Sequence, residues 1–559
     1  MIALRDYQQA AVDGAFEAWK STHSTLVVMP TGGGKTILFA EVIRLVLAGG
    51  TGRCMVIAHR EELIHQAVEK IARVSGERPQ IEMGAQWVQE HSLWASKPKV
   101  VAASVQTLIS GMDGAGRMSR FNPHEFCLVI IDEAHHATAD SYRRVIAHFR
   151  QNENCLILGV TATPDRADEK ALGLVFQSVG YDCELPHLIE GGWLCPIVQQ
   201  FVTVQDLDFS ECRTTAGDLN GADLARVMEE EKIIHGIVDP TVGIVGDKRT
   251  LAFAASVKQA ERMAEVFNRY RPNSARFISG TTPDDVRRDI ISQYRRGEFQ
   301  FLCNCAIATE GFDVPGIQVV IPKATKSRSL FAQMVGRATR PLDGLVDRYE
   351  TPEERRAAIA ASEKPECLVL DFCGVSGRHK LITTADILGG DYDDDVIEAA
   401  TREARESGEA VNMADALERA EREKLRHERE EEERRQRAKP RDGVKAKASY
   451  SSRRVDPFDV LDILPRRERG WDVEKELSPK MRSLLERQGI DPDGLSYARA
   501  GQLCGEIIRR FTTKECTFKQ AKILRSRGID TKGVSAKDAS KMIDEIAERE
   551  GWARRKTSV

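Results

Sequence analysis

The stretch LVVMPTGGGKT, residues 26–36, decides the fold. An apolar run leads into a glycine-rich loop, and apolar residues recur behind the loop at helical spacing over residues 37–43. Strand, loop and helix in this order are typical of a phosphate-binding loop, in which backbone N–H groups surround phosphates while a lysine and a hydroxyl reach the phosphates and Mg²⁺. Gly34, Lys35 and Thr36 match that loop, but Met29 stands where its first glycine is usual. The stretch alone leaves a plain glycine-rich turn open.

The same alternation of elements continues along the chain from Leu4 to about Leu388. Short runs rich in Val, Ile and Leu alternate there with longer amphipathic stretches, which predicts a parallel α/β architecture. Candidate strands form two series: residues 54–58, 100–103, 128–131 and 156–160, and then residues 250–254, 275–278, 301–305, 319–321 and 367–370. An irregular segment near Gly191 to Asp247 separates them. We therefore predict two α/β domains in tandem, with a nucleotide between them.

Composition restricts the class of protein further. The 559 residues are 42% hydrophobic and 30% charged, which is typical of globular domains. No apolar run approaches the roughly 20 residues of a membrane span, and the first residues lack the layout of a signal peptide. We therefore expect a cytoplasmic location and no membrane contact. The 12 cysteines include no CxxC pair, which favours buried free thiols over disulfides or a zinc site.

The composition changes beyond Asp391. Residues 421–437 are almost wholly charged, which favours a solvated helix or linker over a binding surface, and residues 439–470 are typical of a flexible connector. A tandem repeat with an offset of 39 residues follows: Gly489-Ile490-Asp491 matches Gly528-Ile529-Asp530, each predicted to join two helices. From Pro479 to Val559 there are 18 Lys+Arg and 11 Asp+Glu, an excess of +7 within a chain of net charge -4. A packing or dimerisation module and a nucleic-acid or partner-docking module both stay open.

Two further segments carry chemistry that a phosphate-binding loop needs. Asp132 and Glu133 follow an apolar run directly; an aspartate there can hold Mg²⁺, and the glutamate can act as base toward water. Arg337 and Arg340 are three residues apart, a spacing that puts both on one face of a helix. An arginine supplied from a second domain can stabilise charge on the γ-phosphoryl group.

Together these segments resemble a known family. The ordered set comprises Leu4–Gln8, MPTGGGKT at 29–36, Ala58–Leu63, Ala103–Leu108, DEAH at 132–135, Thr161–Thr163, Ala308–Pro315 and Gln333–Arg340. It is similar to the superfamily 2 DEAD/DEAH-box helicases, and within them to RadD-like and phage-encoded DNA helicases, which also carry a segment like Leu370–Gly374. The resemblance covers roughly residues 1–385. The cysteine-rich, zinc-type tail common in RadD-like proteins has no counterpart here.

The resemblance implies two tandem RecA-like parallel-sheet domains, followed by a helical C-terminal region. The expected divisions are residues 1–195, the ATP-binding domain; 196–245, a connecting segment; 246–390, the second RecA-like domain; 391–470, a charged helical segment and linker; and 471–559, a small helical module with the repeat. ATP and Mg²⁺ are the implied cofactors.

The resemblance also implies roles for individual residues. The catalytic set is Lys35, Asp132, Glu133, Arg337 and Arg340; the ATP-binding set adds Arg5, Gln8, Thr31, Gly32, Gly33, Gly34, Thr36, Gly311, Asp313 and Gln333. Thr36 and Asp132 would hold the metal. Thr161 and Thr163 would couple hydrolysis to strand movement. Arg60, Ser104, Gln106, Thr107, Ser279, Gly280 and Thr309 would contact the nucleic-acid backbone.

The function implied is that of an ATP-dependent DNA helicase or translocase in replication, recombination or repair, acting on single-stranded or forked DNA. Replication or recombination proteins are expected partners of the C-terminal module. Three alternatives are an RNA helicase, a duplex-DNA translocase subunit of a restriction or defence complex, and a nucleotide-switched binding module without hydrolysis. Intact Lys35, Glu133 and Arg337 argue against the last.

Overall fold

The chain folds into two compact units, one of residues 1–168 and 174–431 and the other of residues 169–173 and 432–559. A computed structural model provides the coordinates. It describes residues 4–50, 52–90, 96–111, 116–162, 171–215, 217–307, 312, 314–376, 379–390, 392–437, 457–461, 463, 477–525, 527, 529–531 and 533–549. Each unit is described by itself.

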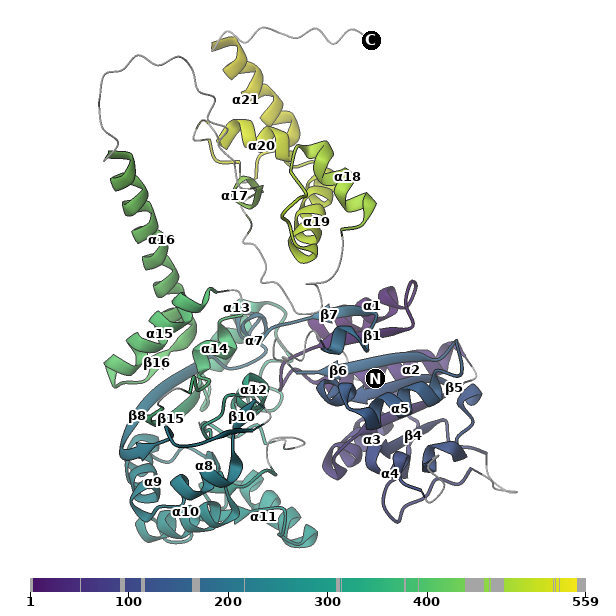
Figure 1. Ribbon diagram of the computed structural model, residues 1–559, viewed down its shortest axis with the longest axis vertical. Helices are drawn as coiled ribbons and strands as arrows, with labels where there is room; N and C mark the ends of the chain where they lie inside the picture. Colours follow the sequence, from purple (N-terminus) through teal and green to yellow (C-terminus); the bar gives the residue numbers. More distant parts are fainter. Residues whose placement is uncertain are drawn as a thin grey trace. The chain divides into compact units, whose positions relative to one another are not determined.

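The first half of the larger unit is built on a parallel seven-stranded sheet (Figure 1). Its order is β3-β4-β2-β5-β6-β1-β7, with β1 Ser24–Val28, β2 Arg53–Ala58, β3 Gln80–Glu82, β4 Val100–Ser104, β5 Phe126–Asp132, β6 Leu156–Thr161 and β7 Ser178–Asp182. The helices are α1 Asp6–Ala18, α2 Lys35–Gly49, α3 Glu61–Ser75, α4 Val105–Ile109 and α5 Asp140–Phe149, with 3₁₀ turns η1 Arg117–Arg120, η2 Pro123–Glu125 and η3 Ala134–Thr138. Every residue of β1, β2 and β4 is buried, as expected for strands covered on both faces.

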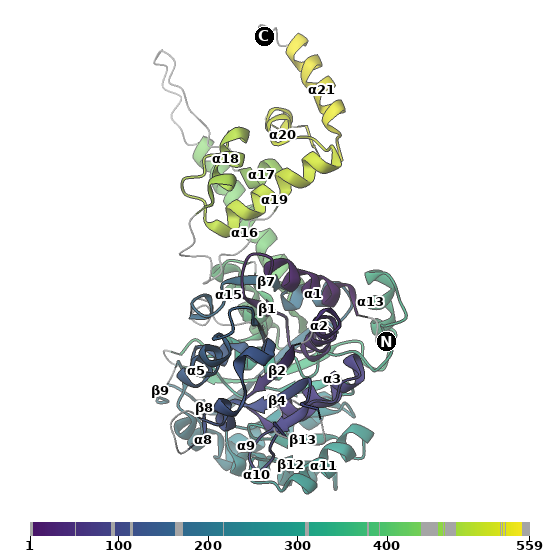
Figure 2. The ribbon, with the colours of Figure 1, turned by 90° about the vertical axis from the view of Figure 1, so that its right-hand side faces the viewer.

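A second seven-stranded sheet follows, with the order β12-β13-β11-β14-β15-β8-β16. Its strands are β8 Ile197–Asp208, β11 Thr250–Phe253, β12 Ala275–Ile278, β13 Phe301–Asn304, β14 Val319–Ile321, β15 Cys367–Val375 and β16 Val411–Asn412, and only β16 pairs antiparallel. The helices are α7 Leu185–Glu190, α8 Gly221–Met228, α9 Glu231–Val245, α10 Val257–Tyr270, α11 Asp284–Arg296, α12 Arg328–Val335, α13 Pro352–Ala360, α14 Thr384–Leu388 and α15 Asp394–Ser407 (Figure 1). Figure 2 labels α8 to α11, α13 and α15 from a second side. The two sheets and the helical C-terminal region confirm the predicted fold class of tandem RecA-like domains.

The segment between the two predicted strand series is regular, so the expectation of irregular structure near Gly191 to Asp247 is wrong. It holds β8, α8, α9 and a two-stranded ribbon of β9 Thr214–Thr215 and β10 Asp218–Leu219. The 12-residue strand β8 pairs with β15 in the second sheet. Its sequence IVQQFVTVQDLD mixes polar residues among apolar ones because its second half is largely exposed, and an apolar run therefore did not mark it.

The charged residues 421–437 lie on helix α16, Met413–Arg437, and residues 421–430, whose burial is described, are exposed or half-buried, which confirms a solvated helix there. Exposed ion pairs one turn apart support it, such as Arg422–Glu418 at 2.6 Å. The connector predicted after it lies mostly outside the described residues. Residues 457–461 are an exception: they form a short helix, α17 Pro457–Leu461, because Phe458, Val460 and Leu461 are buried in the core of the second unit.

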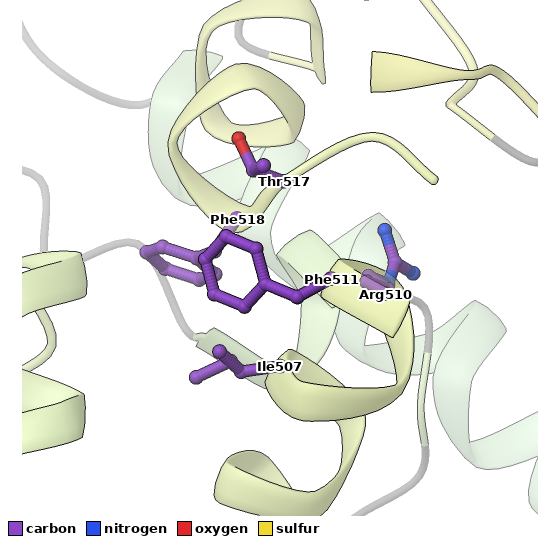
Figure 3. Close-up of a pocket in the computed structure, with 5 residues that line it drawn as sticks. All are labelled: Ile507, Arg510, Phe511, Thr517 and Phe518. Carbon is purple, nitrogen blue, oxygen red and sulfur yellow. The ribbon is translucent and has the colours of Figure 1, made fainter. Parts of the chain in front are cut away.

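The tandem repeat folds as predicted, with a helix before and after each turn: α18 Pro479–Gln488, α19 Tyr497–Thr513, α20 Phe518–Arg525 and α21 Ala536–Arg549. Leu485 and Leu524 occupy corresponding positions in the two copies, as do Ala500 and Ala539. All four are fully buried in one shared core. Figure 3 shows a pocket at the edge of this core, lined by Ile507, Arg510, Phe511, Thr517 and Phe518.

The cysteines are all free thiols, nine buried and three partly buried, which confirms that prediction. Burial raises the pKa of the Cys155 thiol to about 12, whereas a hydrogen bond with Cys54 lowers the pKa of the Cys127 thiol. No helix within the described ranges is long and apolar enough to cross a membrane.

Candidate nucleotide site

The glycine-rich loop connects β1 to α2 in the way a phosphate site requires. Gly32 and Gly34 adopt positive φ values of 92° and 82°, a backbone that other residues rarely adopt. Gly34 is the N-cap of α2, so Lys35 and Thr36 stand in the first turn of a 15-residue helix. The free N–H groups and positive dipole end of such a helix favour a bound anion.

The space around the glycines explains the unusual Met29. A Cβ atom at Gly33 would lie 2.8 Å from Met29 Cγ, and one at Gly34 only 2.4 Å from Gln8 Nε2. The Met29 side chain is fully buried, so it packs against the loop from the core side. The position that lacks the usual glycine is therefore a core position, while Gly32 and Gly34, nearer to α2, are only half-buried.

Residues before β1 hold the loop from the other side. The hydroxyl of Tyr7 and Nε2 of Gln8 both donate to the carbonyl oxygen of Gly33, at 2.9 Å and 3.0 Å. Arg5 donates through Nε and Nη2 to Asp347 Oδ1, at 3.1 Å and 2.9 Å, and its guanidinium lies 4.8 Å from the ring centre of Trp193. Arg5 and Gln8 thus lie beside the loop, and Tyr7, Trp193 and Asp347 are neighbours that the sequence reasoning missed.

Of the two acidic residues at the end of β5, Glu133 lies beside the lysine of the loop. Asp132 and Glu133 are 4% and 5% exposed, and Glu133 has a positive φ of 50°. Lys35 Nζ lies 3.5 Å from Glu133 Oε1. His135 Nδ1 lies 3.4 Å from Glu133 Oε2 and 3.2 Å from the hydroxyl of Thr161, so a histidine without an assigned role connects Glu133 to the end of β6.

The second sheet supplies the other wall of this site. A Cβ atom at Gly336 would lie 2.6 Å from Thr31 Cβ, and one at Gly32 would lie 3.4 Å from Arg340 Cγ. Gln333 is buried on α12, and Arg337 donates to the carbonyl of Phe312 at 3.0 Å. Burial lowers the pKa of Arg340 to about 10, which leaves it charged at neutral pH.

The prediction that Arg337 and Arg340 share one face of a helix is wrong. Helix α12 ends at Val335, with Gly336 as its C-cap, and both arginines follow in turns. Pro341 comes directly after them and cannot extend a helix. Lys364, which the sequence reasoning missed, is buried here and donates through Nζ to the carbonyls of Pro315 and Arg340. Burial lowers the pKa of Lys364 to about 8.

Four of the predicted site residues lie outside the described residues: Thr163, Thr309, Gly311 and Asp313. Thr161 is described, as the last residue of β6, and it is buried.

The residues predicted to contact nucleic acid lie on both halves of the larger unit. Ser104 caps α4, and its hydroxyl donates to Thr107 Oγ1 at 2.8 Å. Gln106 is exposed and donates to the carbonyl of His59, while Arg60 donates to the carbonyl of Ala306 in the second half. In the second half itself, Gly280 is exposed, whereas the buried Ser279 hydroxyl contacts that of Thr281 at 2.9 Å.

Two family models match the chain. "Type III restriction enzyme, res subunit" matches residues 1–166, and "Helicase conserved C-terminal domain" matches residues 237–341.

Among similar proteins, the Saccharomyces cerevisiae "Putative ATP-dependent helicase IRC3" is 30% identical over 72% of this chain and 55% of its own length. A subunit of the Escherichia coli type I restriction enzyme EcoAI is 24% identical over 60% of this chain and 44% of its own. A solved structure of the type ISP restriction-modification enzyme LlaBIII bound to DNA covers 72% of this chain and 30% of its own, with 16% identity and a TM-score of 0.49. The chain spans about half the length of the curated relatives it matches.

Proposed function

Because the chain belongs to the superfamily 2 DExD/H-type helicases, we propose that it hydrolyses ATP and uses the energy to move along or unwind DNA. The single observation that carries the proposal is the contact between Lys35 and Glu133 at 3.5 Å, next to a turn that brings Arg340 from the second sheet. A phosphate-binding lysine, a carboxylate base and an arginine from a second domain are the groups that ATP hydrolysis needs.

The residues of the loop fit a nucleoside triphosphate. Gly32 and Gly34 are half-buried and carry no side chain that could cover their backbone, and the buried hydroxyl of Thr31 has no hydrogen-bond partner within the described part of the chain. Lys35 would bind the β- and γ-phosphates. Thr36 and Asp132 would hold Mg²⁺, which when bound neutralises phosphate charge. Arg5 and Gln8 would contact the adenine.

Hydrolysis would then depend on both halves of the unit. Glu133 would accept the proton of the attacking water, and Arg337 and Arg340, with Gln333, would stabilise the charge on the γ-phosphoryl group. Gly311 and Asp313 are proposed for the same wall. Through His135, Glu133 is linked to Thr161, which we propose to couple hydrolysis, with Thr163, to movement on the strand.

Nucleic acid would bind through its sugar-phosphate backbone. A motor that moves on any sequence needs contacts without base specificity, and the half-buried Arg60 and the exposed Gln106 and Gly280 are polar or backbone groups suited to that task. Ser104, Thr107, Ser279 and Thr309 complete the proposed set. DNA as substrate, a role in replication, recombination or repair, and the cytoplasmic location stay predictions.

The test is the rate of ATP hydrolysis measured side by side with single-stranded DNA, duplex DNA, forked DNA and RNA of equal length. The largest stimulation is expected from single-stranded or forked DNA. Stimulation by RNA alone would overturn the choice of DNA.

A second candidate is a translocase subunit that moves on duplex DNA within a restriction or defence complex. It is favoured by the match to a restriction-enzyme subunit model and by the similarity to a type I restriction enzyme subunit. Stimulation by duplex DNA without strand separation would select it.

A further inference from the structure

An exposed tryptophan lies between β3 and β4 of the first sheet. Trp87 is 53% exposed, a large apolar surface to leave in water. Tryptophan has a flat aromatic face and few rotatable bonds, so a ring that is held in place can serve as a stacking surface.

Two arginines of the 3₁₀ turn η1 hold this ring in place. The guanidinium carbons of Arg117 and Arg120 lie 3.5 Å and 4.6 Å from its centre. Arg117 also donates to the carbonyls of Gly84 at 2.7 Å and Gln86 at 2.9 Å, which lie three residues and one residue before the tryptophan. Arg120 donates to the carbonyl of Val88 at 3.1 Å, directly after it. The backbone is therefore fixed on both sides of an indole that stays more than half exposed.

The charge around the ring is positive. Both arginines contact the same carboxylate, that of the fully buried Glu82, which also accepts a hydrogen bond from the backbone N–H of Val88 at 2.7 Å. One carboxylate facing two guanidinium groups leaves an excess of one positive charge beside the ring. Such a combination of an aromatic surface and positive charge suits a ligand with a flat ring and a negative backbone.

The segment is tied to residues proposed above to contact nucleic acid. The backbone N–H of Gly84 donates to Thr107 Oγ1 at 3.1 Å, and Thr107 in turn accepts from Ser104. Trp87 therefore lies three residues after Gly84, whose backbone is hydrogen-bonded directly to the start of α4.

We propose that Trp87 stacks on an unpaired base of the bound strand, with Arg117 and Arg120 as its support and with Arg120, whose side chain is 33% exposed against 11% for Arg117, as positive charge for the adjacent phosphates. The inference rests on the proposed function. Because every base has a flat face, the contact does not depend on sequence. It requires an unpaired base, and so it favours a single strand over a duplex.

The test compares Trp87→Ala and the wild-type chain for binding to two labelled single-stranded oligonucleotides of equal length, one of thymidines and one with abasic sites throughout. Stacking of one base contributes about 5- to 150-fold to the dissociation constant. We expect Trp87→Ala to lose a factor in this range on the thymidine strand and nothing on the abasic strand, because the backbone contacts remain. Trp87→Phe is expected to keep much of the affinity.

The matched control is Tyr270→Ala, which removes an exposed aromatic side chain, 44% exposed, at the end of α10; it is expected to bind both strands like wild type. Thermal melting of each variant checks the fold. If wild type binds both strands and Trp87→Ala binds each of them with the same dissociation constant as wild type, this inference is wrong and the ring is a surface for another partner. If wild type binds neither strand, the proposed function itself fails.

Discussion

Glu133→Gln removes the negative charge that lies beside Lys35. The two charged atoms are 3.5 Å apart and their side chains are 11% and 6% exposed, so solvent screens them little. Two unit charges at that distance attract each other by about 5 kcal/mol at an effective dielectric constant of about 20. A phosphate group must compete with this attraction to bind the lysine. If removal of the Glu133 charge strengthens nucleotide binding by one fifth of this attraction, about 1 kcal/mol, the dissociation constant of ATP falls about fivefold.

The rate of ATP hydrolysis should fall although ATP binds more tightly. The glutamine cannot accept a proton from water, and loss of a general base lowers the rate by about 10²- to 10⁴-fold. The assay is a titration with a fluorescent ATP analogue, together with the hydrolysis rate of the same preparation. Glu265→Gln, which changes a carboxylate 53% exposed on α10, serves as control and is expected to leave both values unchanged. Turnover near the wild-type rate in Glu133→Gln, or weaker ATP binding, would refute the reasoning.

Three further predictions concern single features. Gly34→Ala should weaken ATP binding at least tenfold in the same titration, because φ is 82° and the new Cβ would lie 2.4 Å from Gln8 Nε2; binding like wild type would contradict the tight loop. Lys364 has a pKa lowered to about 8 from 10.5, so the unfolded chain binds more protons between these values and stability rises with pH there. Urea unfolding at about pH 8 and about pH 9.5 should show wild type gaining about 2 kcal/mol relative to Lys364→Met; an equal pH dependence of the two chains would exclude a buried charge. Deleting residues 457–559 should weaken DNA binding and reduce its salt dependence if the basic module binds DNA, and an unchanged salt slope would leave the module a packing or partner-docking role.

Those parts of the fold that rest on local pattern were predictable from the sequence. The buried strands read as apolar runs because helices cover both faces of each sheet, and the repeat was visible because Gly489-Ile490-Asp491 recurs 39 residues later as Gly528-Ile529-Asp530. Strand β8 was not predictable, since its second half, residues 203–208, is largely exposed and carries polar residues.

The site divides in the same way. Lys35 and Glu133 belong to short linear motifs, so their roles could be predicted from adjacent residues in the sequence. By contrast, Asp347 lies 342 residues from Arg5, and Lys364 reaches carbonyls 24 and 49 residues away, so neither contact leaves a local signal. Helix α12 ends at Val335 with Gly336 as its C-cap, although the spacing of the two arginines suggested that the helix would continue.

The most direct measurement of the central claim is the ATP hydrolysis rate of the wild-type chain with and without single-stranded DNA, at saturating ATP and Mg²⁺. The proposed function predicts a rate that single-stranded DNA raises at least about tenfold and that Glu133→Gln abolishes. A rate that no nucleic acid changes, or hydrolysis that persists in Glu133→Gln, would contradict it.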